Sequence, residues 1–307
     1  MKRKLKAHLL TLPRWFATPF FGSALLLGAV LAGGISGNSW IALVGGLLIM
    51  AGGHSFNSYL DYAWTGIDKG KVEDRSAEKT YTGGQNLLAN GVLSQREVLA
   101  NAICWYVLAL APIIYLSIKV TPWVILLGLI GMGITFWYSW GKFNWTHELS
   151  LGMGSGPLAV LMGMYGTSPH PNPATGILAG IPFAIVLCFA GLALDEWPDA
   201  EANLKKGVKS IAYYVWYASI SLEAYLAVWF SFMYLFQFFL VYLGILDKQT
   251  MWTFVLVPAF MALFVLLRSE DVKVKRESER FKKAAGIFVA VGALYPVLLL
   301  VGQLVGA

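Results

Sequence analysis

Apolar runs of about 20 residues recur along the whole chain and restrict what it can fold into. A run of this length is what an α-helix needs to cross about 30 Å of hydrocarbon. Of the 307 residues, 57% are hydrophobic and only 13% are charged, about half the charged fraction of an ordinary soluble domain. The runs do not alternate with a period of two, so a transmembrane β-barrel is not expected. The sequence predicts an all-α polytopic membrane protein.

Nine spans fit these runs, which predicts a bundle of nine transmembrane helices around a cavity that faces the cytoplasm. The seventh span is longer than one crossing requires, so we expect it to tilt strongly or to break near Gln237. Two glycine-rich stretches, GGH at 52–54 and GMGSGP at 152–157, predict close helix packing. The predicted spans are 16–34, 40–62, 97–117, 121–140, 149–167, 175–194, 211–243, 250–267 and 284–305.

The distribution of lysine and arginine gives this bundle an orientation. If the amino terminus lies in the cytoplasm, 21 of the 23 basic residues fall on cytoplasmic segments, and Lys119 and Lys248 fall outside. This asymmetry follows the positive-inside rule. The basic start, MKRKLKAHLLTLPRW, is then expected to be a cytoplasmic arm and not a cleaved signal. We predict one transmembrane domain, 1–307, in the cell membrane, with cytoplasmic cap loops at about 63–96 and 195–210.

Two acidic stretches, NSYLDYAWTGID and DEWPDAEAN, fall at the cytoplasmic ends of the second and sixth predicted spans. Asn57 and Asp61 are four positions apart, as are Asp195, Asp199 and Asn203, and Asp68 follows Asp61 by seven; these spacings place the side chains of each stretch on one helix face. Two such oxygen clusters, facing one another across a cavity, would hold Mg²⁺ against a substrate diphosphate. The residues concerned are Asn57, Asp61 and Asp68 in the first stretch and Asp195, Asp199 and Asn203 in the second.

A site of this kind points to the departure of diphosphate from an allylic chain. Bound metal would stabilise the negative charge that develops on the leaving group. The carbocation-like fragment would be shielded from water by a wall of apolar and aromatic side chains. A zinc site of histidines and cysteines is not expected, because the histidines are scattered and are predicted to be structural. These histidines are His8, His54, His147 and His170.

Three further polar residues are interpreted by their positions in the predicted helices and are not assigned to the site. Glu148 opens the fifth predicted span, where a carboxylate complements the helix dipole. Ser210 is expected to cap the seventh helix. Glu223 is predicted to lie deep inside the seventh span and therefore to face protein or a cavity.

The first acidic stretch resembles a motif of the UbiA superfamily of intramembrane prenyltransferases. Asn57-x-x-x-Asp61, followed by Gly66 and Asp68, is similar to the family's motif on its second helix, with one extra residue before the glycine. Between the second and third spans, GGQNLLANGVLS resembles a segment of the menaquinone-type branch, which transfers a prenyl chain to 1,4-dihydroxy-2-naphthoate. Asn86 stands there in place of the family's arginine.

Two more motifs extend this resemblance to nearly the whole chain. Asp199 and Asn203, followed by GVKS at 207–210, resemble the family's second motif, with Asn203 in the place of its second aspartate. Tyr138-x-x-x-Lys142 resembles a Tyr-x-x-x-Lys of the fourth helix. The two acidic motifs stand in the family's order, at the expected helices.

The resemblance implies Mg²⁺-dependent transfer of a prenyl chain from an isoprenyl diphosphate to a lipophilic acceptor within the membrane. An aromatic quinone precursor is the expected acceptor, and a glycerol-lipid or tetrapyrrole acceptor stays open. The implied metal ligands and catalytic residues are Asp61, Asp68, Asp195 and Asp199. The implied substrate-binding residues are Asn57, Lys79, Tyr138, Lys142, Asn203 and Lys209.

Two other classes of membrane protein fit the sequence less well than a prenyltransferase. A transporter or channel would place acids near the middle of several spans, whereas the acids here gather at one end. A phosphotransferase that uses CDP-activated head groups would carry a dense D-G-x-x-A-R motif, which this sequence lacks. The expected partners are the two substrates and membrane lipids, without nucleic acid or an obligate protein partner.

Overall fold

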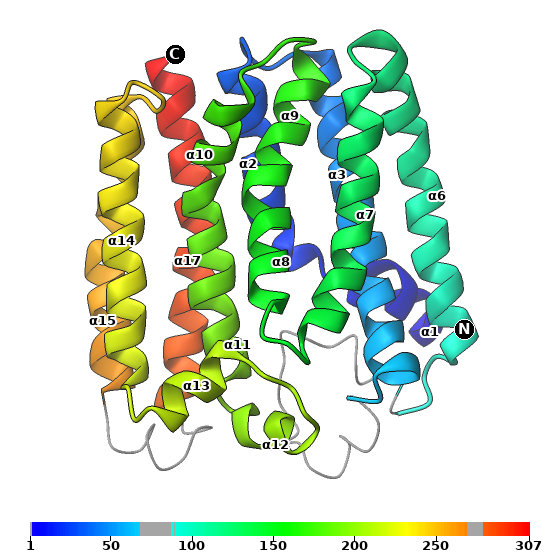
Figure 1. Ribbon diagram of the computed structural model, residues 1–307, viewed down its shortest axis with the longest axis vertical. Helices are drawn as coiled ribbons and strands as arrows, with labels where there is room; N and C mark the ends of the chain where they lie inside the picture. The colour runs from blue at the N-terminus through cyan, green and yellow to red at the C-terminus, as the bar shows by residue number, and fades with distance from the viewer. Residues whose placement is uncertain (1, 68–86, 89, 269–278) are drawn as a thin grey trace.

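The computed structural model describes residues 2–67, 87, 88, 90–268 and 279–307, and these residues form a helical bundle. Its long helices lie side by side along the longest axis of the molecule (Figure 1). Within the described residues, eight helical runs are long and apolar enough to cross a membrane. They are Lys2–Leu31, Gly37–Trp64, Gln95–Lys119, Trp123–Gly141, Pro173–Glu196, Leu222–Tyr242, Lys248–Leu267 and Glu279–Gly306.

The fifth predicted span, 149–167, is helical but is not among these eight runs. It coincides with α8 (His147–Met153), η4 (Gly154–Leu158) and α9 (Ala159–Thr167), which follow one another directly. Glycines and polar residues make this run less apolar than the others. The arrangement of nine spans, and its orientation in the membrane, therefore stay predictions.

The amino-terminal segment is folded against the bundle. Lys4 Nζ in α1 (Lys2–Lys6) lies 2.6 Å from Glu97 Oε1 near the start of α6 (Gln95–Lys119). Asn101 Nδ2, one turn further along α6, donates to the His8 carbonyl at 3.2 Å. The predicted cytoplasmic arm is thus a packed helical entry into the first long helix.

Polar side chains define where several helices begin. Ser36 and Ser94 each form a capping box, which satisfies backbone N–H groups at the first turns of α3 (Gly37–Tyr59) and α6. Ser210 accepts from Tyr213 N and caps α13, as the sequence predicted. The remaining elements are η1 (Ala7–Thr11), η2 (Trp15–Ala17), α2 (Thr18–Leu31), α3 (Gly37–Tyr59), η3 (Leu60–Trp64), α7 (Trp123–Gly141), α10 (Pro173–Ala184), η5 (Ile185–Leu192), α11 (Ala193–Glu196), α12 (Ala200–Lys205), α13 (Ile211–Tyr217), α14 (Leu222–Tyr242), η6 (Lys248–Leu256), α15 (Val257–Leu267) and α17 (Glu279–Gly306).

The seventh predicted span is broken, but not where we expected. The chain leaves α13 after Tyr217, Ser219 adopts a left-handed φ of 55°, and Ser221 caps α14. The expected break near Gln237 is wrong, because α14 runs without interruption from Leu222 to Tyr242. The Gln237 side chain donates to Thr250 O at 2.8 Å inside the bundle. Because α14 begins at Leu222, Glu223 lies in its first turn. The prediction that Glu223 lies deep inside a span is therefore also wrong.

The two glycine-rich stretches pack as predicted. A Cβ added at Gly52 would lie 2.5 Å from Tyr106 Cδ1, and one at Gly156 would lie 2.2 Å from the Gly180 carbonyl oxygen. The closest crossing joins α2 and α9, where a Cβ on Gly163 would lie 1.8 Å from Leu25 O. Glycine lets these helix backbones approach to a distance that any side chain would prevent.

Candidate active site

A cavity of about 590 Å³ lies between α2, α3, α7, η5 and α17. Its volume is within the range of pockets that hold organic ligands. Along α3 it is lined from Asn57 to Gly46, which corresponds to about 16 Å of helix rise. Most of the lining is apolar. The polar lining residues are Arg14, His54, Asn57, Thr135, Tyr138, Asp195 and Lys282.

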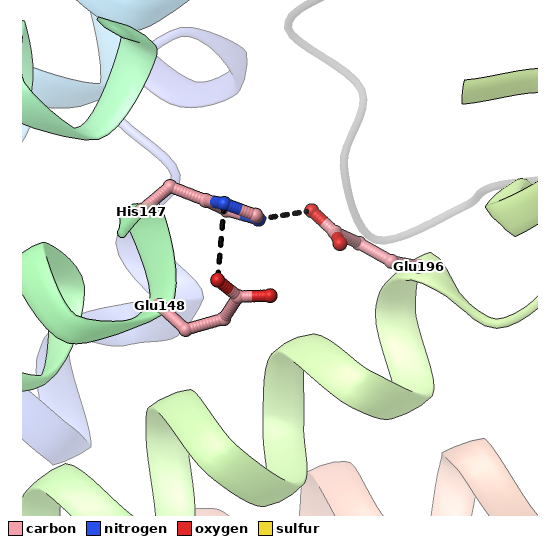
Figure 2. A group of neighbouring side chains, drawn as sticks. All are labelled: His147, Glu148 and Glu196. Atoms are coloured by element: carbon pink, nitrogen blue, oxygen red, sulfur yellow. Dashed lines mark hydrogen bonds and ion pairs between the residues drawn. The ribbon is translucent and has the colours of Figure 1, made fainter. Parts of the chain in front are cut away.

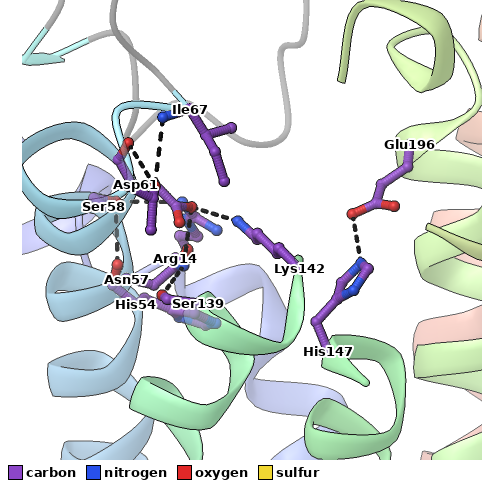
Figure 3. A network of polar contacts seen from close by, with 11 residues as sticks. Arg14, His54, Asn57, Ser58, Asp61, Ile67, Ser139, Lys142, His147 and Glu196 are labelled. Carbon is purple, nitrogen blue, oxygen red and sulfur yellow. Dashed lines mark hydrogen bonds and ion pairs between the residues drawn. The ribbon is translucent and has the colours of Figure 1, made fainter. Parts of the chain in front are cut away.

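The first acidic motif forms a buried polar network at one end of this cavity (Figure 3). Asp61 is fully buried, and Lys142, at the end of α7, is 7% exposed. Lys142 Nζ lies 2.5 Å from Asp61 Oδ2, which also accepts a hydrogen bond from Asn57 Nδ2 at 3.0 Å. Asn57 Nδ2 also lies 3.1 Å from Ser139 Oγ. Three residues that the sequence assigned to metal or substrate are thus in direct contact.

The helices that carry the two acidic motifs widen into π-helical turns close to the acids. Asp61 lies within the π-helical segment η3, and the π-helical segment η5 leads into α11, which carries Asp195. A π-turn shifts the direction of the side chains that follow it and is frequent at functional sites. The sequence placed these residues on regular helix ends and did not predict the widening.

The second acidic motif spreads over two short helices. Asp195 in α11 lines the cavity, and Asp199 occupies the position just before α12. Asn203, within α12, is buried, and its Oδ1 has no hydrogen-bond partner among the residues that the structure describes. Buried polar atoms are nearly always paired. An unpaired amide oxygen at this position fits a site that a cation would complete.

The ends of the two motifs lie close together. Lys206 Nζ, just after α12, donates to the carbonyl of Ile67 at 3.1 Å. Tyr138, Asn57 and Asp195 line the same cavity. The backbone N–H of Lys209 donates to the Lys142 carbonyl at 2.7 Å, although the Lys209 side chain is exposed. The expected residues Asp68 and Lys79 lie outside the described residues.

The donor set suits Mg²⁺. Asp61, Asp195 and Asp199 offer carboxylate oxygens, and Asn203 offers an amide oxygen that no described residue pairs. Hard oxygen donors without sulfur or imidazole are the ligands that Mg²⁺ prefers, usually shared with substrate phosphates. The chemistry of these donors therefore suits the implied metal. In the described part of the chain, the one group of three His, Cys, Asp or Glu residues whose ligand atoms lie within 4.8 Å of one another is His147, Glu148 and Glu196.

Arg14 belongs to this network, and the sequence analysis missed it. Arg14 adopts a left-handed φ of 51° between η1 and η2, and its Nη2 donates to Ser58 Oγ at 3.3 Å. It lines the cavity beside Asn57. In the sequence, Arg14 is one of several basic residues of the amino-terminal arm. Its separation from the lysine-rich start was the one signal that could have distinguished it as a site residue.

His147 forms a buried cluster that the sequence analysis also missed (Figure 2). Its Nδ1 lies 3.0 Å from Glu148 Oε2, and its Nε2 lies 3.1 Å from Glu196 Oε1. Glu148 Oε1 accepts from the backbone N–H of Ile211 at 2.6 Å, at the start of α13. Both ring nitrogens thus face a carboxylate, and the ring joins α8 to the helix that carries Asp195. This arrangement links the helices, and the structural role of His147 stays a prediction.

Comparison with known proteins gives the arrangement a family context. A family model described as the UbiA prenyltransferase family matches residues 19–294. The chain is 28% identical over 161 residues to a 1,4-dihydroxy-2-naphthoate octaprenyltransferase of Bacillus subtilis (strain 168). This match covers 51% of the present chain and about half, 48%, of the relative.

Solved structures of low identity share the fold. A UbiA homologue from Aeropyrum pernix K1 matches with a TM-score of 0.65 and 17% identity, over 95% of this chain and 97% of that one. A UbiA homologue from Archaeoglobus fulgidus, bound to DMAPP and Mg²⁺, matches with a TM-score of 0.55 and 16% identity, over 94% and 98%. A digeranylgeranylglyceryl phosphate synthase matches with a TM-score of 0.56 and 14% identity, over 100% and 99%.

Proposed function

Because the chain belongs to the UbiA prenyltransferase family, we propose that it transfers a prenyl chain from an isoprenyl diphosphate to a lipophilic acceptor within the membrane. The observation that carries this proposal is one cavity lined by residues of both acidic motifs, Asn57 and Asp195. The same cavity continues for about 16 Å along an apolar face of α3. A polar end for a diphosphate and an apolar length for its hydrocarbon chain are what this substrate class requires.

The polar end would bind the diphosphate together with Mg²⁺. Asp61, Asp195 and Asp199, together with Asp68, would hold the metal, and Asn203 would contribute its unpaired amide oxygen. Bound Mg²⁺ would supply positive charge that stabilises the leaving diphosphate. Asn57 would orient Asp61 through the hydrogen bond that the two side chains form.

Basic residues would complete the diphosphate site. Lys142 is buried beside Asp61. Arg14, which precedes η2, lines the cavity. Lys209, whose backbone is joined to that of Lys142, and Lys79 would add charge from the loops. These groups would neutralise phosphate oxygens that the metal leaves uncompensated.

The apolar length of the cavity would hold the prenyl chain and exclude water from the allylic carbon. Phe20, Met50, Leu158 and Phe288 are among its lining residues. Tyr138 lies where the polar and apolar parts meet, in contact with the Lys142 ammonium at 4.8 Å from its ring centroid. An electron-rich ring at this point would favour a fragment that carries positive charge.

The acceptor proposed first is an aromatic quinone precursor. Sequence similarity to a naphthoate octaprenyltransferase supports it. A glycerol-lipid acceptor is the second candidate, because a digeranylgeranylglyceryl phosphate synthase has a similar fold. We place the site on the cytoplasmic side, where the distribution of basic residues puts both motifs.

The proposal is tested with purified protein, labelled geranylgeranyl diphosphate and two acceptors, 1,4-dihydroxy-2-naphthoate and geranylgeranylglyceryl phosphate. We expect a prenylated product, identified by mass spectrometry, in the presence of Mg²⁺ and none with EDTA. A protein that neither binds the donor in a Mg²⁺-dependent manner nor forms product with a panel of membrane lipid extracts would contradict prenyl transfer. Flux of ions through reconstituted vesicles would instead favour the transporter alternative.

A further inference from the structure

His54 lies on the face of α3 that carries the first acidic motif. It precedes Asn57 by three residues and Asp61 by seven, so the three side chains form one stripe along the helix. Beyond His54, the cavity-lining residues of α3 are Gly53, Met50, Ile49 and Gly46, which carry no polar side chain. His54 therefore stands where the polar end of the cavity passes into its apolar length.

One hydrogen bond fixes the protonation pattern of the His54 ring. Its Nδ1 lies 2.6 Å from the carbonyl oxygen of Pro13. Because a carbonyl oxygen can only accept, Nδ1 must carry the hydrogen. A second proton on the ring would place another positive charge beside the Arg14 guanidinium in a mostly apolar cavity, which is unfavourable. The neutral ring then has an unprotonated Nε2, which is a hydrogen-bond acceptor.

Several polar groups near His54 are engaged in other contacts, whereas Arg14 Nε has no hydrogen-bond partner among the described residues. Asn57 Nδ2 is shared between Asp61 and Ser139, and Thr135 Oγ1 accepts from the Tyr106 hydroxyl at 3.3 Å. Among the described residues, no hydrogen bond reaches Nε2 of His54. The cavity wall thus presents an acceptor atom with open capacity next to the polar end.

We propose that Nε2 of His54 accepts a hydrogen bond from a hydroxyl group of the prenyl acceptor and so selects and orients hydroxyl-bearing acceptors. This inference rests on the proposed prenyl transfer. A diphosphate bound near Asp61 would direct its prenyl chain past Asn57 and His54, which both line the cavity, and the acceptor would have to reach the allylic carbon there. Phenolic and alcoholic hydroxyls share the required chemistry, so an aromatic diol and a glycerol lipid both satisfy it.

The test measures binding and not turnover. Protein in nanodiscs is titrated with 1,4-dihydroxy-2-naphthoate and with its dimethyl ether, and separately with geranylgeranylglyceryl phosphate and with its O-methyl derivative. Tryptophan fluorescence reports binding. We expect the wild type to bind at least one hydroxylated probe about tenfold more tightly than its ether, because the ether cannot donate to Nε2. The pair that shows the preference identifies the source of the hydroxyl.

Three variants attribute this preference to His54. His54→Phe should abolish the preference, whereas His54→Asn, whose amide keeps both a donor and an acceptor, should retain part of it. If the His54→Phe protein does not fold, as judged by thermal melting, His54→Leu is used in its place. His170→Phe, at an exposed position before α10, is the matched control and should retain the full preference.

Equal binding of hydroxylated and methylated probes by the wild type in both pairs would overturn the inference. A full preference in both His54→Phe and His54→Leu would overturn it as well. Mg²⁺-dependent binding of geranylgeranyl diphosphate to the wild type is measured in the same preparation. Its absence counts against prenyl transfer itself, so the two proposals fail on different measurements.

Discussion

At the scale of residues, the ion pair between Lys142 and Asp61 determines the character of the site. Both side chains are buried, and removing one partner would leave the other charge without compensation. The loss of one partner of a buried pair costs about 3–5 kcal/mol. A single substitution of Lys142 or Asp61 is therefore expected to lower both the stability and the activity of the protein, so the two effects must be measured separately.

Asp61→Asn should lower prenyl transfer by at least about a hundredfold, because it removes a carboxylate that would hold Mg²⁺. It should also lower the melting temperature, because Lys142 loses its counterion. The double variant Asp61→Asn/Lys142→Met should recover the melting temperature and stay inactive. Asp247→Asn is the control, since Asp247 caps η6 and asparagine caps equally well. An active Asp61→Asn protein would remove Asp61 from the site.

Asn203→Asp should lower the Mg²⁺ concentration that gives half-maximal activity. The resemblance places an aspartate at this position, and the unpaired Asn203 Oδ1 would be replaced by a charged oxygen. Asn203→Leu should raise the same concentration. Titration of activity with Mg²⁺ at saturating donor separates metal affinity from maximal rate. An identical Mg²⁺ response of all three proteins would show that Asn203 is not a ligand.

Residue identities could be predicted from the sequence where a motif recurs at helical spacing, and not where distant segments meet. Asn57 and Asp61 are one turn apart, so their contact follows from the helix. Lys142 lies 81 residues from Asp61, and Arg14 lies 44 from Ser58. Lys142 and Asp61 were expected to bind the same substrate but not to form a direct ion pair. No local sequence pattern indicated this contact or the contact between Arg14 and Ser58.

At the scale of elements, the crossing of α2 and α9 is the closest of the bundle's glycine-mediated contacts. The Cα hydrogen of Gly163 faces the backbone of Leu25, so a methyl group there would collide with a carbonyl that cannot move aside. Overpacking of this kind costs about 1–3 kcal/mol.

Gly163→Ala should therefore lower the melting temperature of the detergent-solubilised protein by several degrees. Gly133→Ala is the matched control, because an added Cβ there meets no atom within 4 Å and alanine favours the helix. We expect Gly133→Ala to leave the melting temperature unchanged or slightly higher. Equal melting temperatures for the two variants would contradict the close crossing.

Element boundaries could be predicted where caps accompany the apolar run. Ser94 and Glu97 form the capping box that begins α6, close to the predicted start at 97. The break between α13 and α14 has no such signal, because residues 217–221, YASIS, contain neither glycine nor proline. Ser219 takes its left-handed conformation within the tertiary structure, and sequence propensity is a weak guide at such places.

At the scale of the whole molecule, the predicted orientation leads to a labelling experiment. In a Cys104→Ser background, His170→Cys should react with a membrane-impermeant maleimide on intact cells. Lys205→Cys, on α12, should react after the membrane is permeabilised and not before. Both positions are exposed in the structure, so a difference in reactivity reports the side of the membrane. Labelling of Lys205→Cys on intact cells would reverse the orientation.

The all-helical character of the bundle was predictable because long apolar runs allow few solutions in a membrane. The position of the cavity was not, because it depends on which faces of α3 and α7 meet. Apart from the polar stripe at the end of α3, hydrophobic side chains occur on all sides of these helices, so most of their sequence does not distinguish the face toward the cavity from the face toward lipid.

The buried ammonium of Lys142 has a consequence for the order in which substrates arrive. A divalent ion that bound Asp61 without a diphosphate would compete with the Lys142 ammonium. Displacing this ammonium would leave a buried charge without a counterion in a medium of low dielectric. A metal that arrives already chelated by its donor brings anionic oxygens to which the displaced lysine can turn. Binding would then exchange one ionic partner of Lys142 for another. We expect the protein to bind free Mg²⁺ weakly and to bind Mg²⁺ tightly only together with the isoprenyl diphosphate.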